Sequence, residues 1–498
     1  MMLIKNRIIW LAIVASVFIG CKKDDGISVM LENEVNEFIW FGMNTFYYWQ
    51  GEVEDLSIDK YPTRNELNTF LNGYDDPKAL FDDLLVDQDR FSWIVDDYEA
   101  LENQFQGISK SFGYELGLLR VSSGSDDLLG YVKYVIPNGP AENAGLKRGD
   151  VFTTVNETKL NVNNYTSILF GTDSYTITLA EIQDNTITQT DNQVSMTAVQ
   201  LTENPILKSD VLDIEGQKIA YLMYNQFIDN NAYHEELNSV FGEFKSAGVT
   251  DLVLDLRYNG GGALRTSRIL ASMIYGAGSS NDILGSILYN QNLADAGLNT
   301  DLKFFNEVPV FDNDGNQTSS YPMNRLNISR IFILTTGSSA SASEFVIAGL
   351  LPYMDVTLIG TTTVGKNVGS ITLYDSPDEG YLDKGSDLNP NHKYAIQPII
   401  SQLANSQGFT DYIDGLEPNV EVDEKDYLGN FQPLGDPSEP LLAEALAIIS
   451  SVARVERADD NGLRTFDHDE PLKEVVNTIL IDRELIPTVS PRNPSFIK

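Results

Sequence analysis

From residue 205 onward, short apolar runs alternate with amphipathic segments, and this alternation limits the folds open to the chain more than any other feature of its sequence. Runs typical of buried strands lie at Lys218–Met223, Leu252–Leu256, Arg330–Leu334 and Val356–Ile359. Segments with helical spacing lie between them, at Tyr233–Ala247, Ala263–Ile274 and Ala342–Leu350. Strands that alternate with helices in this way predict a mostly parallel sheet covered by helices. We expect this αβ core to span residues 203–453, with a polar, Asn- and Gly-rich insertion at 277–326.

The chain has 498 residues, enough for two to four domains, and two smaller regions precede the core. Residues 31–109 carry apolar side chains at helical spacing, which predicts a small helical domain. The aromatic residues 47–49 are expected in its core rather than in a ligand site. Residues 110–202 change to short strand-like runs. The predicted fold class is therefore multidomain α+β. Residues 454–498 form a C-terminal extension of unassigned role, in which 472–481 is a helix candidate.

Residues 1–20 have the form of a secretory signal peptide, in which positive charges precede an apolar run at 8–19. The run is shorter than the roughly 20 residues that span a bilayer, and an N-terminal core helix is the alternative. The sequence Phe18-Ile19-Gly20-Cys21 resembles a bacterial lipobox, with Phe where Leu is more common. The alternative is a chance cysteine. The resemblance implies a lipid on Cys21, a tether at 21–30, and a bacterial cell-envelope protein anchored to the outer membrane, at its periplasmic face or on the cell surface.

Charge and residue counts argue against several other classes of function. The formal net charge is −38, which disfavours binding to nucleic acid or to an anionic membrane through a basic face. A single cysteine, Cys21, rules out an intrachain disulfide and a multi-cysteine zinc site. The three histidines are far apart in the sequence, so no HExxH-type metal motif is present. We expect neither a metal nor another cofactor.

Three segments follow core strands, and the carboxyl ends of such strands are where active groups collect. Asp255–Gly262 ends in consecutive glycines, which can bring backbone N–H groups close to a substrate or simply form a flexible turn. Thr335–Glu344 places several serines at a helix N-terminus, which favours developing negative charge, although a serine there can also be an N-cap. Gly360–Lys366 places a lysine in a glycine-flanked loop, and a solvated lysine is the alternative. It is not a phosphate-binding loop, because Asn367 follows the lysine.

In their order and spacing, these segments resemble the carboxy-terminal processing peptidases, or tail-specific serine proteases, over residues 90–450. The family combines a helical N-terminal region, a PDZ domain and an αβ core of the ClpP/crotonase type. Ser339–Glu344 matches the nucleophile motif, and Val364–Lys366 matches the lysine motif. Asp255–Gly262 matches the glycine motif, with Gly260 where the family often has Pro. Shorter matches lie at Asp89–Ser92 and Gly415–Val422.

The resemblance implies a catalytic mechanism. Ser341 would attack a peptide carbonyl, and neutral Lys366 would take its proton. An ordinary lysine is neutral in about one molecule in a thousand at neutral pH, so burial must lower its pKa, by about 3. The N–H groups of Ala342 and Gly261 would form the oxyanion hole. Ser370 stands where the family commonly has a Gln that orients the lysine, which predicts a modified third partner.

The segment Pro140–Asn156 resembles a PDZ domain, which places this domain at 110–202. Within it Leu116, Gly117 and Leu118 match the loop that receives a peptide C-terminus, although a plain strand is the alternative. The resemblance implies a serine endopeptidase that recognises the C-termini of protein or peptide substrates. An inactive peptidase scaffold that binds peptides in the cell envelope, or a purely structural envelope protein, remains the alternative.

Overall fold

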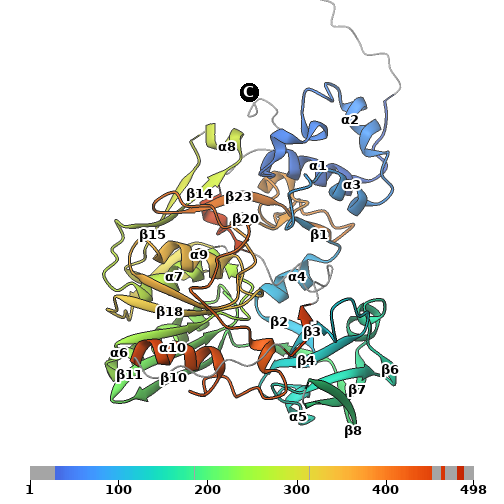
Figure 1. The fold of residues 1–498 in the computed structure, drawn as a ribbon. Coiled ribbons are helices and arrows are strands. Elements are labelled where there is room, and N and C mark those ends of the chain that lie inside the picture. Colours follow the sequence, from blue (N-terminus) through green and yellow to red (C-terminus); the bar gives the residue numbers. More distant parts are fainter. Residues whose placement is uncertain are drawn as a thin grey trace, which may run out of the picture.

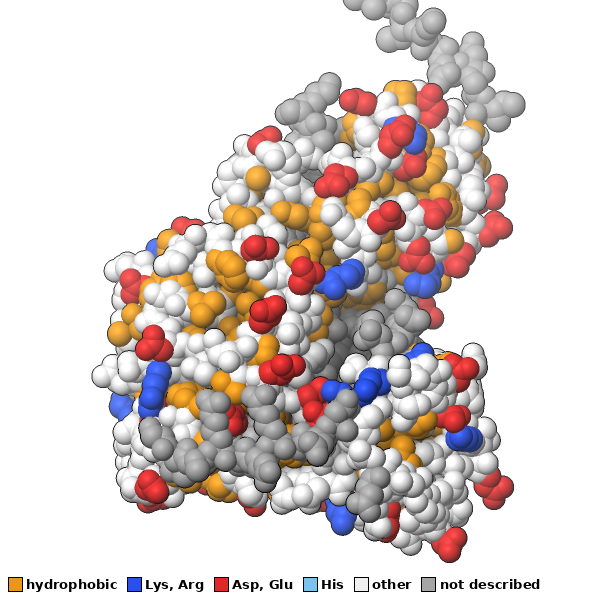
Figure 2. Space-filling model, viewed as in Figure 1, with side chains coloured by type: hydrophobic (Ala, Val, Ile, Leu, Met, Phe, Trp, Pro, Cys, Tyr) orange, Lys and Arg blue, Asp and Glu red, His pale blue; other side chains and the backbone are white. Residues whose placement is uncertain are grey.

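The computed structural model of the chain describes residues 28–450, 461–465 and 479–486, apart from 184, 296, 313 and 314. The predicted signal peptide and Cys21 lie outside these residues. Figure 1 shows a helical part that precedes a β-rich part and a larger α/β core, so the prediction of a mixed α/β, multidomain fold is confirmed. Figure 2 shows acidic side chains spread over one face of the molecule, with few basic ones among them.

The helical part owes its short helices to strong N-terminal signals. Asn33 caps the first helix, Thr63 forms a capping box with Glu66, and Asp76 caps a helix that begins with Pro77. Of the aromatic residues 47–49, Tyr47 is fully buried, whereas Tyr48 and Trp49 are only partly buried. The helices are α1 (Glu34–Phe46), α2 (Arg64–Leu71), α3 (Pro77–Asp83) and α4 (Tyr98–Phe105), with short turns η1 (Gln50–Glu52) and η2 (Glu54–Leu56). The part is joined to the core by a three-stranded sheet of β1 (Trp93–Val95), β22 (Ala395–Gln397) and β21 (Leu373–Tyr374).

The β-rich part is a sheet with its own apolar core. The strand order is β25-β3-β4-β5-β7-β8, with β6 paired to β5. The strands are β3 (Tyr114–Arg120), β4 (Leu128–Val135), β5 (Val151–Val155), β6 (Thr158–Lys159), β7 (Ser174–Gln183), β8 (Thr186–Thr197) and β25 (Arg464–Thr465). The short helices are α5 (Pro140–Asn143) and η3 (Thr166–Phe170). A ribbon of β2 (Ile108–Ser111) and β9 (Val199–Thr202) brings together the two ends of this part.

A six-stranded sheet forms the centre of the core. Its order is β10-β11-β12-β18-β19-β24, and all neighbours except the hairpin β10–β11 are parallel. The strands are β10 (Ile206–Ile214), β11 (Gln217–Tyr224), β12 (Asp251–Asp255), β18 (Arg330–Thr335), β19 (Asp355–Gly360) and β24 (Val420–Glu421). Apolar contacts place α6 (Asn231–Ala247), α7 (Leu264–Ile274) and α9 (Ala342–Leu350) on one face and α10 (Pro440–Ser450) on the other. Burial on both faces explains why the strands are continuous apolar runs.

A second sheet packs beside the first. Two segments of it, one within 277–326 and one at 479–480, differ from what the sequence predicted. Its order is β13-β26-β20-β23-β14-β15. The strands are β13 (Gly262–Ala263), β26 (Ile479–Leu480), β20 (Val368–Ser370), β23 (Ile399–Asn405), β14 (Ile283–Tyr289) and β15 (Thr300–Lys303). The part of the predicted insertion 277–326 that forms β14 and β15 therefore belongs to the core, because Leu284, Ile287 and Leu302 are fully buried. It also contains α8 (Gln291–Asp295) and the hairpin of β16 (Glu307–Phe311) and β17 (Gln317–Pro322).

The second correction concerns the helix predicted at 472–481. Residues 472–478 lie outside the described residues, and Ile479 and Leu480 are a strand rather than the end of a helix. An apolar run with β-branched residues fits a strand between two others as well as it fits a helix.

A buried charge network joins the β-rich part to the core. Arg148 lies before β5 and donates to Tyr258 Oη at 2.6 Å and to Glu424 Oε2 at 3.2 Å. Arg257, fully buried, donates to the carboxylates of Asp255 and Glu439 at distances from 2.5 to 3.1 Å. These residues surround the end of β12, so the network fixes the position from which the glycine segment starts.

Candidate active site

The three segments singled out in the sequence meet at the carboxyl ends of β12, β18 and β19. The backbone N–H of Ala340 donates to Asn259 O at 3.1 Å, and the N–H of Val364 donates to Ser339 O at 3.0 Å. Ser343 Oγ donates to the same Asn259 carbonyl at 2.9 Å. The glycine, serine and lysine segments are thus in direct contact, as the parallel arrangement of their strands requires.

Ser341 lies in a constrained position at the start of α9. Its backbone has φ 63° and ψ −109°, values that a residue with a side chain adopts only where the surrounding structure enforces them. The side chain is 1% exposed, and its Oγ has no hydrogen-bond partner. Ser341 is thus the N-cap residue of α9 by position, but its hydroxyl makes no capping hydrogen bond and is buried without a partner.

Glu344 connects the serine segment to the lysine segment. Its Oε2 accepts hydrogen bonds from the N–H groups of Ser341, at 2.7 Å, and Lys366, at 2.9 Å. Its Oε1 accepts from the N–H of Gly365 at 2.7 Å and from Thr363 Oγ1 at 2.5 Å. Burial raises the pKa of this carboxyl, and the four hydrogen bonds oppose that effect. The sequence analysis gave Glu344 no role, although a Glu three residues after a serine at a helix start was a visible signal.

Lys366 is 1% exposed, and burial lowers its pKa to about 7. The negative charges of Asp89 and, more weakly, Glu344 act in the opposite direction. Its Nζ lies 4.8 Å from the centre of the Phe91 ring. The solvated-lysine alternative is wrong, because this amine is enclosed by protein.

The short segment Asp89–Ser92 holds the lysine segment from the other side. Asp89 Oδ1 accepts from the N–H groups of Phe91 and Ser92 at 2.8 and 2.9 Å, which fixes the turn. Arg90 donates to Gly365 O at 3.3 Å. The sequence analysis noted this segment but did not foresee its contact with the lysine.

Ser370 lies on β20 and is fully buried. Gln397 on β22 donates from Nε2 to Ser370 Oγ at 3.2 Å, and its Oε1 accepts from Thr372 Oγ1 at 2.8 Å. A glutamine amide therefore does lie at this site, but it comes from a different strand, 27 residues later in the chain. Sequence reasoning missed Gln397 because only the sheet pairing of β21 with β22 brings it near.

The two predicted oxyanion donors differ in this structure. Ala342 is the first residue of α9, and such an N–H has no acceptor within its helix. Gly261 has φ 117°, and its N–H donates to Asn259 Oδ1 at 2.9 Å. The Gly261 N–H is therefore engaged here and must leave Asn259 before it can bind another oxygen.

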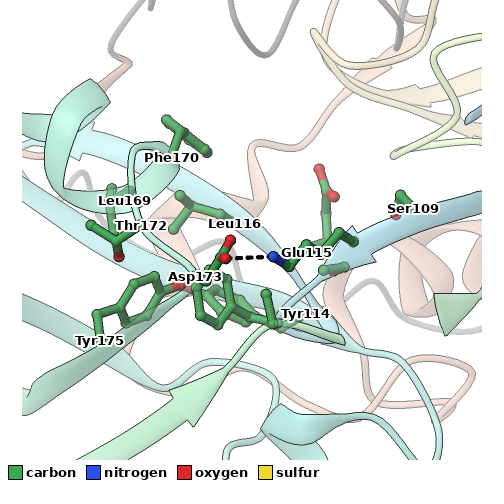
Figure 3. A pocket seen from close by; sticks show the side chains of 13 residues that line it. Ser109, Tyr114, Glu115, Leu116, Leu169, Phe170, Thr172, Asp173 and Tyr175 are labelled. Carbon is green, nitrogen blue, oxygen red and sulfur yellow. Dashed lines mark hydrogen bonds and ion pairs between the residues drawn. The ribbon is translucent and has the colours of Figure 1, made fainter. Parts of the chain in front are cut away.

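The predicted peptide-binding residues lie on β3, but they face different surroundings. Leu116 lines a cavity of about 420 Å³ together with Phe170 of η3. Figure 3 shows these two side chains beside Asp173. Asp173 forms an ion pair with Lys110 at 2.5 Å. Leu118 is buried in the apolar core, and a side chain at Gly117 would strike the Tyr131 ring. Of the three, only Leu116 reaches the cavity.

Among the described residues, no group of three or more His, Cys, Asp or Glu side chains is arranged to hold a metal ion. In the same part of the chain, no helix combines the length and the apolar character needed to cross a bilayer.

Comparisons with known proteins show that the chain is similar to serine peptidases. The profile of peptidase family S41 matches residues 218–400, and the profile of the peptidase S41 N-terminal domain matches residues 34–93. The two matches fall on the core and on the helical part. They show that these two parts of the chain are similar to peptidase family S41 and to its N-terminal domain.

Individual relatives are peptidases by name. The chain is 25% identical over 323 residues to the chloroplastic C-terminal processing peptidase of Tetradesmus obliquus. This match covers 61% of this chain and 60% of the relative. It is 24% identical over 321 residues to the chloroplastic carboxyl-terminal-processing peptidase 2 of Arabidopsis thaliana, and this match covers 59% of this chain and 55% of the relative. The chain thus spans less than two thirds of the length of these curated relatives. A solved structure assigned as an S41 protease of Bacteroides fragilis has a TM-score of 0.63 and 25% identity, and the match covers 86% of this chain and all of that one.

Proposed function

We propose that this chain is a serine endopeptidase that cleaves protein or peptide substrates with Ser341 as nucleophile and Lys366 as general base. The observation that carries the proposal is a lysine whose pKa burial lowers to about 7, on a loop that Glu344 ties to the serine. With a pKa near 7, about half of the lysines are neutral at pH 7, whereas an ordinary lysine is almost entirely charged there.

The reaction proceeds in two steps. Ser341 Oγ attacks the peptide carbonyl and gives its proton to Lys366 Nζ, and the carbonyl oxygen becomes an oxyanion. The intermediate collapses, the C–N bond breaks, and the lysine returns the proton to the leaving amine. Water then attacks the acyl-enzyme with the lysine again as base, which releases the second product and frees the serine.

The surrounding groups support this chemistry. The N–H of Ala342, at the positive end of α9, would stabilise the oxyanion, and the Gly261 N–H would join it after release from Asn259. Ser370, held by Gln397, would orient the lysine amine, in place of a glutamine on the lysine segment itself.

Substrate recognition through a PDZ domain is part of the proposal. A C-terminal peptide segment would add beside β3 in the cavity between Leu116 and Phe170. We further propose that Cys21 carries a lipid that anchors the protein to the bacterial outer membrane. Lipid labelling of the parent, and its absence in Cys21→Ser, would support the anchor.

The test is proteolysis by the purified chain, beside Ser341→Ala and Lys366→Ala. The substrates are an unfolded protein and peptides that end in apolar residues, and mass spectrometry identifies the cuts. Cleavage that both variants lose supports the mechanism. Tight peptide binding without cleavage favours the alternative, an inactive scaffold that captures peptides, and cleavage that survives Ser341→Ala excludes this serine as nucleophile.

A further inference from the structure

Strand β26 lies in the second sheet between β13 and β20, two strands that carry residues of the candidate active site, and residues 481–486 follow it. Ile479 pairs with Gly262 and Leu480 with Ala263, both in parallel. Leu480 also pairs with Ser370, and the N–H of Ile481 donates to Ser370 O at 3.0 Å. Strand β26 therefore has the end of the glycine segment on one edge and Ser370, the residue expected to orient the lysine, on the other.

The side chains that follow β26 occupy defined positions. Ile481 is 4% exposed and packs on Gly369, where an added Cβ would lie 2.5 Å from its Cδ1. Asp482 Oδ1 accepts from the N–H of Arg265 at 3.1 Å, and its Oδ2 lies 4.0 Å from the Arg268 guanidinium. We call the space between β13 and β20 that residues 479–482 fill the groove. It has a position for an aliphatic side chain, followed by a position for a carboxylate.

The carboxylate position is the N-terminus of α7. This helix follows the glycine segment directly, and its N-cap residue, Ala263, supplies no side-chain hydrogen bond. Asp482, distant in sequence, takes that place and puts a negative charge where the helix dipole and an arginine both favour one.

With β26 in place, the glycine segment cannot accept another chain. On its other edge, the N–H of Ala263 donates to Phe227 O at 2.7 Å, and the N–H of Phe227 donates to Gly261 O at 2.8 Å. Both edges of β13 are therefore occupied. An extended peptide that added to β13 beside the candidate nucleophile would have to take the place of β26.

We propose that the groove between β13 and β20 binds extended peptides by strand addition, and that residues 479–482 of the same chain occupy it in the resting state. The proposal rests on the proposed peptidase function and adds the class of peptide, an aliphatic residue followed by an acidic one. Only Ile479 and Leu480 of this segment are paired as a strand, so few backbone bonds would have to break for another peptide to take their place.

The test weakens the strand without removing chain. Ile481→Pro deletes the N–H that donates to Ser370 and prevents normal pairing. Arg483→Pro is the matched control, because Arg483 is the first residue of η6 (Arg483–Leu485), where proline is tolerated. The preceding residue, Asp482, has φ −61° and ψ 131°, which a following proline also accepts.

The probe is a fluorescent peptide with the sequence of residues 479–486, and binding is measured by anisotropy on full chains that also carry Ser341→Ala. We expect Ile481→Pro to bind the probe at least about tenfold more tightly than the parent or Arg483→Pro, because its groove is no longer filled in cis. A probe with Asp482→Asn should bind several-fold more weakly than the original. With Ser341 intact, Ile481→Pro should also cleave an unfolded protein faster than Arg483→Pro does.

Two results would overturn the proposal. One is equal binding of the probe by all three proteins. The other is an Ile481→Pro protein that fails to fold while Arg483→Pro folds, since β26 would then be a structural strand. The two proposals can also fail separately: tighter binding without any cleavage supports the groove and contradicts the peptidase, whereas cleavage with equal binding does the reverse.

Discussion

Replacing Lys366 by Met removes the charge that burial opposes, so the variant should be more stable than the parent below neutral pH. The pKa of Lys366 falls from its ordinary value of 10.5 to about 7 in the folded protein. Between these values the unfolded chain holds more protons than the folded one, so the parent gains stability as pH rises through this window. Below pH 7 the folded protein must bury a charged lysine, at a cost of up to about 5 kcal/mol.

The Lys366→Met variant avoids this cost, because methionine has a similar length and no charge. Its advantage over the parent should be largest at pH 6, should shrink between pH 7 and 10, and should disappear above about pH 10.5. Each kcal/mol corresponds to roughly 2–4 °C in the melting temperature of a domain of this size. Thermal unfolding of both proteins across this pH range measures the effect.

The control is Ser341→Ala, which removes no group that titrates in this range. Its difference in melting temperature from the parent should not change with pH. Two results would refute the claim that burial lowers the pKa of Lys366. One is a stability difference between Lys366→Met and the parent that does not change with pH. The other is a parent that is more stable than the variant at pH 6.

Three further predictions concern the groups around the lysine and the glycine segment. The kcat/KM of the parent should rise with pH through an inflection near 7, and Asp89→Asn should move that inflection to lower pH, because the Asp89 carboxylate raises the pKa of Lys366. Glu344→Gln should reduce kcat at least about tenfold and destabilise the core by about 2 kcal/mol, because the amide nitrogen cannot accept the N–H bonds that the carboxylate accepts; a variant with normal activity and melting temperature would contradict this. Glu439→Gln should lower the free energy of unfolding by about 3–5 kcal/mol, because the buried guanidinium of Arg257 loses one of its carboxylate partners. Denaturant titration measures this loss, with the exposed Glu99→Gln as control.

Patterns that repeat along the chain allowed the central sheet and its helices to be predicted. The helix predicted at 342–350 has those bounds in the structure, and the three segments after β12, β18 and β19 do come together. The reason is local: continuous apolar runs specify buried strands, and groups at the carboxyl ends of parallel strands meet at one edge.

Features that depend on distant pairing could not be predicted. The polarity of residues 277–326 hid β14, whose place in the core depends on pairing with β23. The contact of Gln397 with Ser370, and the engagement of the Gly261 N–H by Asn259, depend on how neighbouring loops fold. The role of β26 is visible only in the pairing of a short apolar run with two strands far from it in sequence.

The competition around Lys366 links these observations. Two carboxylates near the amine, Asp89 and Glu344, favour its charged form, and burial is the effect that outweighs them. Neither carboxylate can be removed without loss elsewhere, since Asp89 fixes the turn that carries Phe91 and Glu344 joins the serine and lysine segments. The Lys366 amine is therefore substantially neutral at neutral pH only while protein atoms keep water from it. If water entry raised the pKa of Lys366 from about 7 to about 9, the neutral fraction at pH 7 would fall about fiftyfold. In the proposed reaction, groups that exclude water at this site, such as the Phe91 ring over Nζ, would therefore control the rate together with the residues that react.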